Sequence, residues 1–225
     1  QILGQRHADI RNGLSVPIKI KMSNVFDLIS KPNWCFEMAK SKNRTFGNIM
    51  GHVKDIKNLT SLTKWVQSQF DPKLNWDDVK RIKDWWGGKL IIKGIMDPDD
   101  AKMAQKCGAD ALVVSNHGGR QLDGVNSSIS MLPQIKKAIS GIEVLFDGGI
   151  SSGQDILKAI ALGAEGVMIG RSFVYGLSAK GKKGVKNALE ILNKELDMTM
   201  ALCGRRDIND VGRDIIKDCP FFEKN

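Results

Sequence analysis

The sequence of 225 residues predicts an α/β fold in which helices cover a parallel β-sheet. From residue 76 onward, short apolar runs alternate with amphipathic segments, and the unit recurs at intervals of roughly 25 to 30 residues. The apolar runs contain few polar residues, which is typical of parallel strands that are buried on both faces. Both features suit either a (βα)₈ barrel or a doubly wound sheet.

The elements follow one another in a regular order. A helix is expected over 75–86, because its apolar positions repeat with helical spacing and Gly87 and Gly88 end it. The apolar run 89–95 predicts the first strand. Asp97 is a suitable N-cap and Pro98 a suitable first residue for the next helix. The remaining predictions are strands over 111–115, 142–147 and 165–170, helices over 127–140 and 152–164, and helices from there to the C-terminus.

The ends of the predicted strands favour the barrel. Four successive apolar runs stop at Lys93, Ser115, Asp147 and Gly170. Carboxyl ends of parallel strands meet at one rim, and a barrel builds its active site there. A doubly wound sheet normally has a G-x-G-x-x-G turn after its first strand, and no such turn is found here.

Glycines follow the last two predicted strands instead. Gly148 and Gly149 come after Asp147, and Gly170 precedes Arg171. Backbone N–H groups exposed at adjacent barrel loops form the usual phosphate cradle of such barrels. A tight turn explains either glycine motif alone, but their occurrence on consecutive strands favours a phosphate site.

Composition narrows the possible partners and cofactors. The net charge is +9, and many of the basic residues fall in helical segments such as 180–196, where a solvated face explains them. No helix-turn-helix, zinc-finger or aromatic RNA-binding pattern is present, so no nucleic-acid partner is expected. The four cysteines are far apart and the histidines are not clustered, so we expect reduced thiols and no metal site.

The sequence also bears on contact with a membrane. No run of about 18 apolar residues exists for a membrane span, and residues 1–13 lack the features of a signal peptide. Residues 31–59 mix bulky apolar and basic side chains, which makes a peripheral contact with an anionic membrane surface the alternative to a solvated face. The sequence therefore predicts a chain that is soluble or at most peripherally attached.

One motif carries the clearest chemical signal. The stretch SNHGGRQLDG, residues 115–124, places an imidazole and a guanidinium directly after a buried strand. Together with LIIKGI (90–95), FDGGI and the following helix (146–164), and IGR-x-F-x-YGL (169–177), it resembles the FMN-dependent α-hydroxy acid oxidizing enzymes. The resemblance covers essentially the whole chain. Within that family, residues 45–95 are most similar to the bacterial respiratory L-lactate dehydrogenases.

The resemblance implies a role for each rim residue. A 2-hydroxy acid loses two electrons and two protons as it becomes a 2-oxo acid, so its enzyme needs a base and cations for the carboxylate. His117 is similar to the family's base, and Arg120 and Arg6 to its two carboxylate-binding guanidiniums. Lys93 is similar to the cation beside the flavin, and Ser115 to a donor to the flavin ring. The resemblance assigns the ribityl chain and phosphate of FMN to Asp147, Gly148, Gly149, Gly170 and Arg171.

Structural alternatives stand beside these roles. His117 could be an ordinary loop histidine, Arg6 could pair with Asp9 at the surface, and Lys93 could extend its ammonium from a strand end to solvent. Ser151 also departs from the family, in which an arginine commonly stands two residues after Asp-Gly-Gly. One positive contact to the FMN phosphate is therefore expected to be missing.

The resemblance also places the chain within the barrel. Gln1 falls just beyond the motif that ends the family's fourth strand, so residues 1–225 are expected to form a single domain running from that point through strand 8 and the C-terminal helices. Residues 20–75 would be a variable excursion after strand 4. The chain would then carry about half of the family's active site.

The predicted function is FMN-dependent oxidation of an L-2-hydroxy acid, with L-lactate to pyruvate favoured and a quinone or cytochrome of the respiratory chain as acceptor. The family implies a homotetramer, located in the cytoplasm or at the cytoplasmic side of the bacterial inner membrane. The alternatives are oxidation of glycolate or mandelate, another FMN barrel such as a type 2 isopentenyl diphosphate isomerase or an IMP dehydrogenase-like enzyme, and a non-catalytic remnant. The closely spaced His117 and Arg120 argue against another FMN barrel, because the substrates of those other enzymes have no hydroxy carboxylate to bind.

Overall fold

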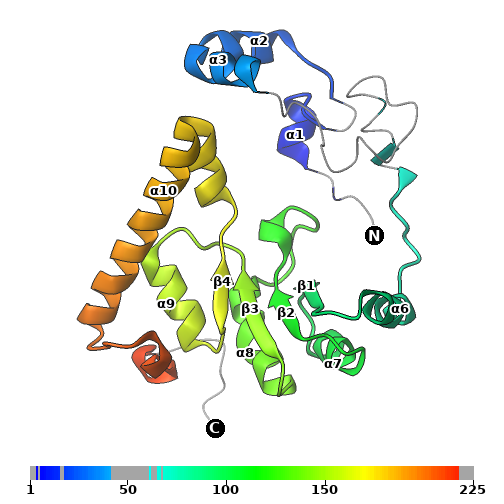
Figure 1. Cartoon of the computed structure of the whole chain (residues 1–225), viewed down its shortest axis with the longest axis vertical. Helices are drawn as coiled ribbons and strands as arrows, with labels where there is room; N and C mark the ends of the chain where they lie inside the picture. Colours follow the sequence, from blue (N-terminus) through cyan, green and yellow to red (C-terminus); the bar gives the residue numbers. More distant parts are fainter. Residues whose placement is uncertain are drawn as a thin grey trace. The chain divides into compact units, whose positions relative to one another are not determined.

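A computed structural model describes residues 4, 6–15, 18–41, 61, 65–66 and 68–217. The chain divides into two compact units, Gln1–Leu74 and Asn75–Asn225, and the positions of its parts relative to one another are not determined (Figure 1). Each unit is therefore described by itself. The predicted single domain over 1–225 stays a prediction, as does the excursion over 20–75, of which residues 42–60 lie outside the described part.

The second unit contains a parallel sheet of four strands. These are β1 (Ile91–Ile95), β2 (Ala111–Val114), β3 (Glu143–Asp147) and β4 (Gly166–Met168). They lie in the order β1-β2-β3-β4, so every strand is hydrogen-bonded to the strand that follows it in the chain. A doubly wound sheet reverses its strand order at a switch point, whereas a barrel keeps its strands in sequence. The described sheet is that of a barrel segment, as predicted.

Helices alternate with the strands, as Figure 1 shows. They are α6 (Trp76–Trp86), α7 (Pro98–Lys106), α8 (Ser128–Ala138), α9 (Gly153–Ala161) and α10 (Arg171–Leu202), with 3₁₀ turns η1 (His117–Gly119), η2 (Ile208–Asp210) and η3 (Arg213–Ile215). The predicted caps are confirmed, since Asp97 accepts the N–H of Asp99 at the start of α7 and Gly87 ends α6 in the left-handed region. Each predicted strand is present in a shorter form.

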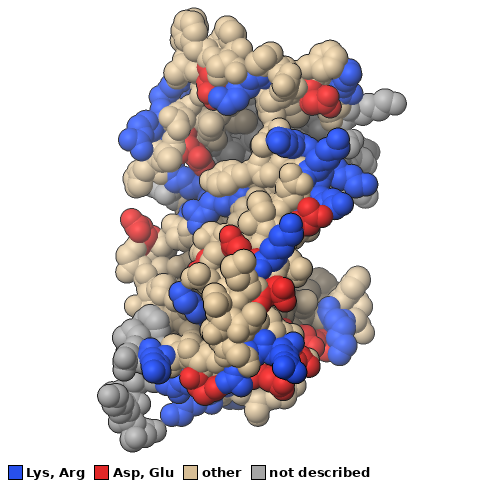
Figure 2. Space-filling view, turned by 90° about the vertical axis from the view of Figure 1, so that its left-hand side faces the viewer, with Lys and Arg blue, Asp and Glu red and all other residues tan. Residues whose placement is uncertain are grey.

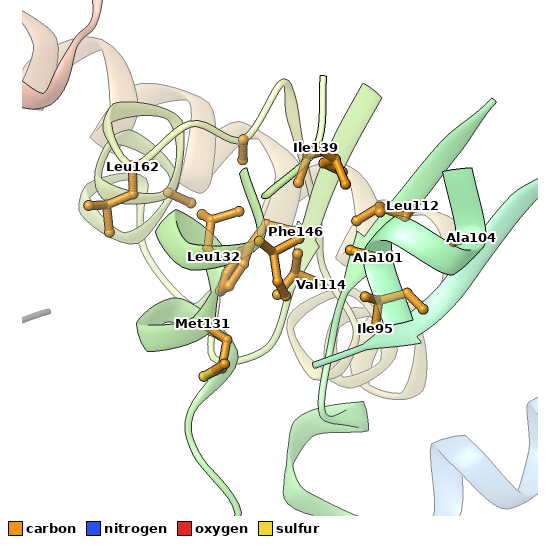
Figure 3. Packing of buried hydrophobic residues seen from close by; sticks show 14 of the residues in the cluster. Ile95, Ala101, Ala104, Leu112, Val114, Met131, Leu132, Ile139, Phe146 and Leu162 are labelled. Carbon is orange, nitrogen blue, oxygen red and sulfur yellow. The ribbon is translucent and has the colours of Figure 1, made fainter. Parts of the chain in front are cut away.

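The hydrophobic core lies on one face of this sheet. Leu112 and Val114 of β2 and Phe146 of β3 are almost fully buried against Leu132 of α8 and Ala104 of α7 (Figure 3). Because side chains alternate along a strand, every second residue of β2 and β3 joins this cluster. The helices therefore cover one face of the sheet, as they do around a barrel.

Of the strands β1, β2 and β4, only β2 is buried on both faces. All four residues of β2 are buried, whereas Ile91 of β1 is 53% exposed and Met168 of β4 is 42% exposed. The prediction that every strand is buried on both faces is wrong for these two strands. They are the outer strands of the described sheet, so each has a neighbouring strand on one side.

The long helix α10 is bent. Lys180 and Gly181 have non-helical backbone angles, and the bend lets the segments on either side pack against each other. Their contact is close, because a Cβ atom on Gly176 or on Gly184 would meet the carbonyl group of the other residue. The second segment then packs along α9, where Gly153 donates its N–H to Glu195 at 2.9 Å.

Two carboxylates secure the amino end of the sheet. Asp110, before β2, accepts hydrogen bonds from Lys83 of α6 (2.6 Å), from Lys89 (2.8 Å) and from the Leu90 N–H (2.9 Å). Glu165 precedes β4, two βα units further along the chain. It accepts hydrogen bonds from Lys136 of α8 and from the Val144 N–H, the latter at 2.7 Å. Each clamp ties a helix to the start of the strand that follows it.

The first unit is helical in its described part. Its helices are α1 (His7–Arg11), α2 (Met22–Ile29) and α3 (Pro32–Lys40), and none of them contains a buried residue. Among the described residues of the whole chain, no helix combines the length and apolarity of a membrane span. Lys and Arg side chains are spread over the face seen in Figure 2, with Asp and Glu side chains among them.

The Asp110 clamp leads to a stability prediction. Hydrogen bonds from Lys83, then from Lys89 and the Leu90 N–H, hold the pKa of Asp110 well below its usual range. We expect Asp110→Asn to lower the thermal midpoint at pH 7 by on the order of a few degrees, because the charge-assisted bonds are lost. Thermal unfolding followed by circular dichroism measures this change.

The pH dependence of the stability difference between wild type and Asp110→Asn follows from the downward shift of the Asp110 pKa. A carboxyl with a lowered folded-state pKa stabilises the fold fully above its unfolded pKa of about 4, and this contribution disappears as the pH falls through the folded value. The gap between wild type and Asp110→Asn should therefore be constant from pH 7 to about 5 and shrink below about 4. Glu190→Gln, which breaks an exposed pair with Lys186 on α10, is the control. An equal effect of both variants at pH 7 would contradict the clamp.

Candidate active site

The parallel register brings three predicted residues to one end of the sheet. Lys93 pairs in register with Val113, and Val113 with Leu145. Ser115 and Asp147 lie two residues beyond Val113 and Leu145, so they share a face with them. None of these side chains belongs to the core beneath the helices. Lys93, Ser115 and Asp147 therefore meet at the carboxyl end, on the face that the helices leave uncovered.

The three side chains form one hydrogen-bonded network. The Lys93 Nζ atom lies 2.7 Å from Asp147 Oδ2 and 2.8 Å from Ser115 Oγ, and the Ser115 hydroxyl donates to Asp147 Oδ1 at 2.6 Å. Ser115 is only 2% exposed, whereas the side chain of Lys93 is 39% exposed. The network thus holds a partly accessible ammonium at a defined place on the rim.

His117 follows directly from this network in an unusual conformation. Among the described residues it is the one non-glycine with a positive φ, at 57°. Its N–H donates to Ser115 Oγ at 3.0 Å, and two residues later the Gly119 N–H donates to Asn116 Oδ1 at 3.2 Å. Asn116 was not predicted as a site residue. The sequence did hold a signal for it, because Asn116 lies between Ser115 and His117 and three residues before Gly119. Asparagine side chains often accept hydrogen bonds from nearby backbone N–H groups in turns.

The glycine loops lie beside the same rim. Gly148 has φ 120°, and a Cβ there would meet the hydroxyl of Ser128. A Cβ on Gly149 or Gly170 would meet no atom within 4 Å, so the backbone at both places borders open space. The guanidinium of Arg171 lies near Gly118, since its Nη2 atom is 3.4 Å from the position of a Cβ on that glycine. Arg171 and the His117 loop are therefore neighbours.

The two predicted carboxylate-binding arginines lie in different units of the chain. Arg120 follows η1 in the second unit and is exposed. Arg6 belongs to the first unit, where its Nη1 atom lies 3.7 Å from Asp9 Oδ2. The surface ion pair weighed for Arg6 is thus present. Its role as the second half of a carboxylate clamp stays a prediction.

Ser151 takes part in the cap of α9. Its N–H and hydroxyl both donate to Asp155 Oδ2, at 3.0 and 3.2 Å, and Ser152 completes the cap. Burial raises the pKa of Asp155, but the hydrogen bonds from Ser151 and Ser152 outweigh it and the net shift is downward. The carboxylate is therefore charged at neutral pH and satisfied locally. No group of three side chains suited to a metal ion occurs within the described ranges.

Comparisons with known proteins agree with these features. The sequence model of the FMN-dependent dehydrogenase family matches residues 1–218. The L-lactate dehydrogenase of Actinobacillus pleuropneumoniae serotype 5b (strain L20) is 42% identical over 217 residues, which are 96% of this chain and 57% of that protein. The L-lactate dehydrogenase of Stenotrophomonas maltophilia (strain R551-3) is 42% identical over 219 residues, 96% of this chain and 58% of that protein.

Solved structures give the same picture. The monotopic membrane protein (S)-mandelate dehydrogenase is 33% identical, with a TM-score of 0.87, and the match covers 96% of this chain and 57% of that one. A mandelate oxidase is 41% identical, with a TM-score of 0.64, over 69% of this chain and 46% of that one. The chain thus spans somewhat more than half the length of the curated relatives that it matches.

Proposed function

Because this chain belongs to the FMN-dependent dehydrogenase family, we propose that it supplies the proton-transfer and flavin-phosphate part of a site that oxidises an L-2-hydroxy acid. The observation that carries the proposal is the rim network. Lys93, Ser115 and Asp147 are linked by hydrogen bonds and lie next to His117, at the end of the sheet where barrels place their chemistry.

The rim suits FMN in three respects. Open backbone at Gly149 and Gly170 gives a phosphate room to approach N–H groups, and Arg171 offers a guanidinium nearby. Asp147 can accept hydrogen bonds from the ribityl hydroxyls, and Gly148 lets the chain turn tightly behind it. Lys93 offers a fixed positive charge on the same rim. When bound, FMN would accept the two electrons that the substrate loses.

The residues of this chain would handle protons and orientation. His117 would take a proton from the substrate, because an imidazole can act as a base near neutral pH. Arg120 would bind the substrate carboxylate with its planar fork, and the family resemblance gives Arg6 the same role. Lys93 would favour negative charge that develops on the reduced cofactor, since a preorganised cation acts most strongly where little water intervenes.

The substrate proposal follows the relatives. Two relatives at 42% identity are named L-lactate dehydrogenases, which supports L-lactate and its oxidation to pyruvate. The names of the solved neighbours support mandelate as a second candidate. We also propose a quinone or a cytochrome as the electron acceptor and a homotetramer as the assembly, both on the family resemblance.

We further propose that the first unit contacts a membrane. Met22, Val25, Phe26 and Ile29 repeat at helical spacing along α2, and they are 69%, 38%, 67% and 70% exposed. Trp34 and Phe36 of α3 are exposed as well, and Lys40 lies 4.0 Å from the centre of the Phe36 ring. Such a mixture suits the interfacial zone of an anionic bilayer. The match to a monotopic membrane protein supports this proposal. A location at the cytoplasmic side of the bacterial inner membrane is proposed on the family resemblance alone.

The base assignment is tested by replacing His117 with asparagine. Asparagine tolerates a left-handed backbone, so the turn should survive while the base is lost. In a flavin-loaded enzyme that contains this segment, we expect flavin to stay bound and its reduction by L-lactate to slow by about 10²- to 10⁴-fold. Stopped-flow absorbance of the flavin measures the rate. The control is His7→Asn in α1, and reduction at the wild-type rate in His117→Asn would refute the assignment.

The carboxylate contacts are tested with lysine substitutions. Arg120→Lys keeps the charge but loses the two-pronged geometry, so affinity for oxalate, an analogue of the 2-oxo acid product, should fall about tenfold or more. Arg6→Lys should weaken oxalate binding in the same direction. Flavin absorbance during oxalate titration gives the affinity, with Arg81→Lys on α6 as a control for lost guanidinium geometry. Unchanged oxalate affinity in both variants would mean that neither arginine binds the carboxylate.

The membrane contact is tested by adding charge to α2. Phe26→Asp and Ile29→Asp should each reduce binding to phosphatidylglycerol vesicles about tenfold or more, because a buried apolar contact is replaced by a repelled carboxylate. Cosedimentation measures the bound fraction. Ile191→Asp changes an apolar residue on α10 that is 56% exposed and should leave binding unchanged. An equal loss in all three variants would indicate a general charge effect instead.

A further inference from the structure

We infer that Ser115 and Asn116 are positioning residues that hold His117 in its left-handed conformation, so that the imidazole is presented at the rim. The inference rests on the proposed function, because His117 is the base only there. The resemblance implies a different role for Ser115, that of a donor to the flavin ring, and gives none to Asn116.

The conformation of His117 requires support. Left-handed backbone is disfavoured for residues with a Cβ, although histidine tolerates it better than most. Such conformations persist where the surroundings determine them, and they occur often at functional sites. His117 has φ 57°, and Gly118 and Gly119 after it also have positive φ, at 66° and 71°. The turn thus departs from ordinary extended or helical backbone at three consecutive residues.

The two preceding side chains supply that support. The Ser115 Oγ atom accepts the His117 N–H at 3.0 Å, and Asn116 Oδ1 accepts the Gly119 N–H at 3.2 Å. The two bonds hold the N–H groups on either side of Gly118. A polar side chain that bonds a backbone N–H two or three residues ahead fixes a turn without help from regular structure.

Ser115 connects this turn to the three strand ends. It is 2% exposed, donates to Asp147 Oδ1 and accepts from both Lys93 Nζ and the His117 N–H. A hydroxyl has one proton and two lone pairs, so these three bonds fill its capacity. The Ser115 hydroxyl therefore fixes His117 relative to Lys93 and Asp147.

Asn116 closes the loop that carries His117. Its Nδ2 atom donates to the carbonyl oxygen of Asn126 at 3.4 Å, while its Oδ1 atom holds Gly119. One side chain thus joins both ends of the loop 116–126. Aspartate at this position would keep the acceptor for Gly119 and lose the donor to Asn126, so it separates the two contacts.

The test uses the full chain with isotope-labelled histidine, free of flavin and substrate. The chain has three histidines, His7, His52 and His117, so the first two serve as internal references. In Ser115→Ala and in Asn116→Leu, the backbone shifts and coupling of His117 should move away from left-handed values. Its amide should exchange with solvent roughly fivefold to tenfold faster, because a supporting hydrogen bond is lost.

Two further variants sharpen the result. Asn116→Asp should restore the His117 signals that Asn116→Leu shifts, because the acceptor for Gly119 returns. Ser130→Ala removes a hydroxyl that bonds within the first turn of α8 and should leave His117 unchanged. Thermal unfolding shows whether each variant is folded, and if Ser115→Ala is not, the Asn116→Leu and Asn116→Asp pair decides.

The outcomes are separable from those of the proposed function. Wild-type His117 signals in both Ser115→Ala and Asn116→Leu would overturn the inference, and so would failure of Asn116→Asp to restore them. A base assignment refuted by His117→Asn kinetics would leave these signals unaffected, because they are recorded without flavin. Shifted His117 signals together with normal His7 and His52 signals support the positioning role.

Discussion

The parallel register of β1, β2 and β3 is the constraint on which the site depends. It aligns Lys93, Ser115 and Asp147 along one edge of the sheet, on the face away from the helices. A register shift by one residue would turn each of these side chains toward the helices, where a charged group would be buried without a partner. The core formed by Leu112, Val114 and Phe146 therefore keeps the polar residues in place, because it fixes which face each residue occupies.

The two ends of the sheet differ in the polar contacts that they contain. At the carboxyl end, Ser115 links a cation, an anion and a strained turn. At the amino end, Asp110 and Glu165 tie helices α6 and α8 to the strands that follow them. The amino-end clamps recur after two βα units, whereas the residues of the carboxyl end differ from strand to strand. In barrels, loops at the carboxyl end usually change chemistry and the opposite end supports the fold.

Ser151 belongs to the cap of α9. The resemblance predicts an arginine at this position, but in this chain the serine donates its N–H and its hydroxyl to Asp155 at the start of α9. The Asp155 carboxylate is satisfied by its own helix end, and Arg171 is the remaining arginine at the predicted phosphate loops. Recognition of the phosphate would then rest on Arg171 and on the open backbone at Gly149 and Gly170.

The sequence by itself determined the element order, the barrel class and the rim position of Lys93, Ser115 and Asp147, because strand periodicity and caps such as Asp97 are local signals. Motifs of the same kind indicated the FMN family, which the comparisons confirm. Only the tertiary structure decided that Lys93 and Asp147 form a direct pair, that Ser115 is fully engaged and that Asn116 supports His117. Those contacts join residues on different strands or depend on the backbone angles of the turn. A hydropathy pattern predicts neither which side chains meet across strands nor the angles of a turn. The exposure of Ile91 and Met168 likewise depends on which strands lie beside theirs, and that is a property of the assembled sheet.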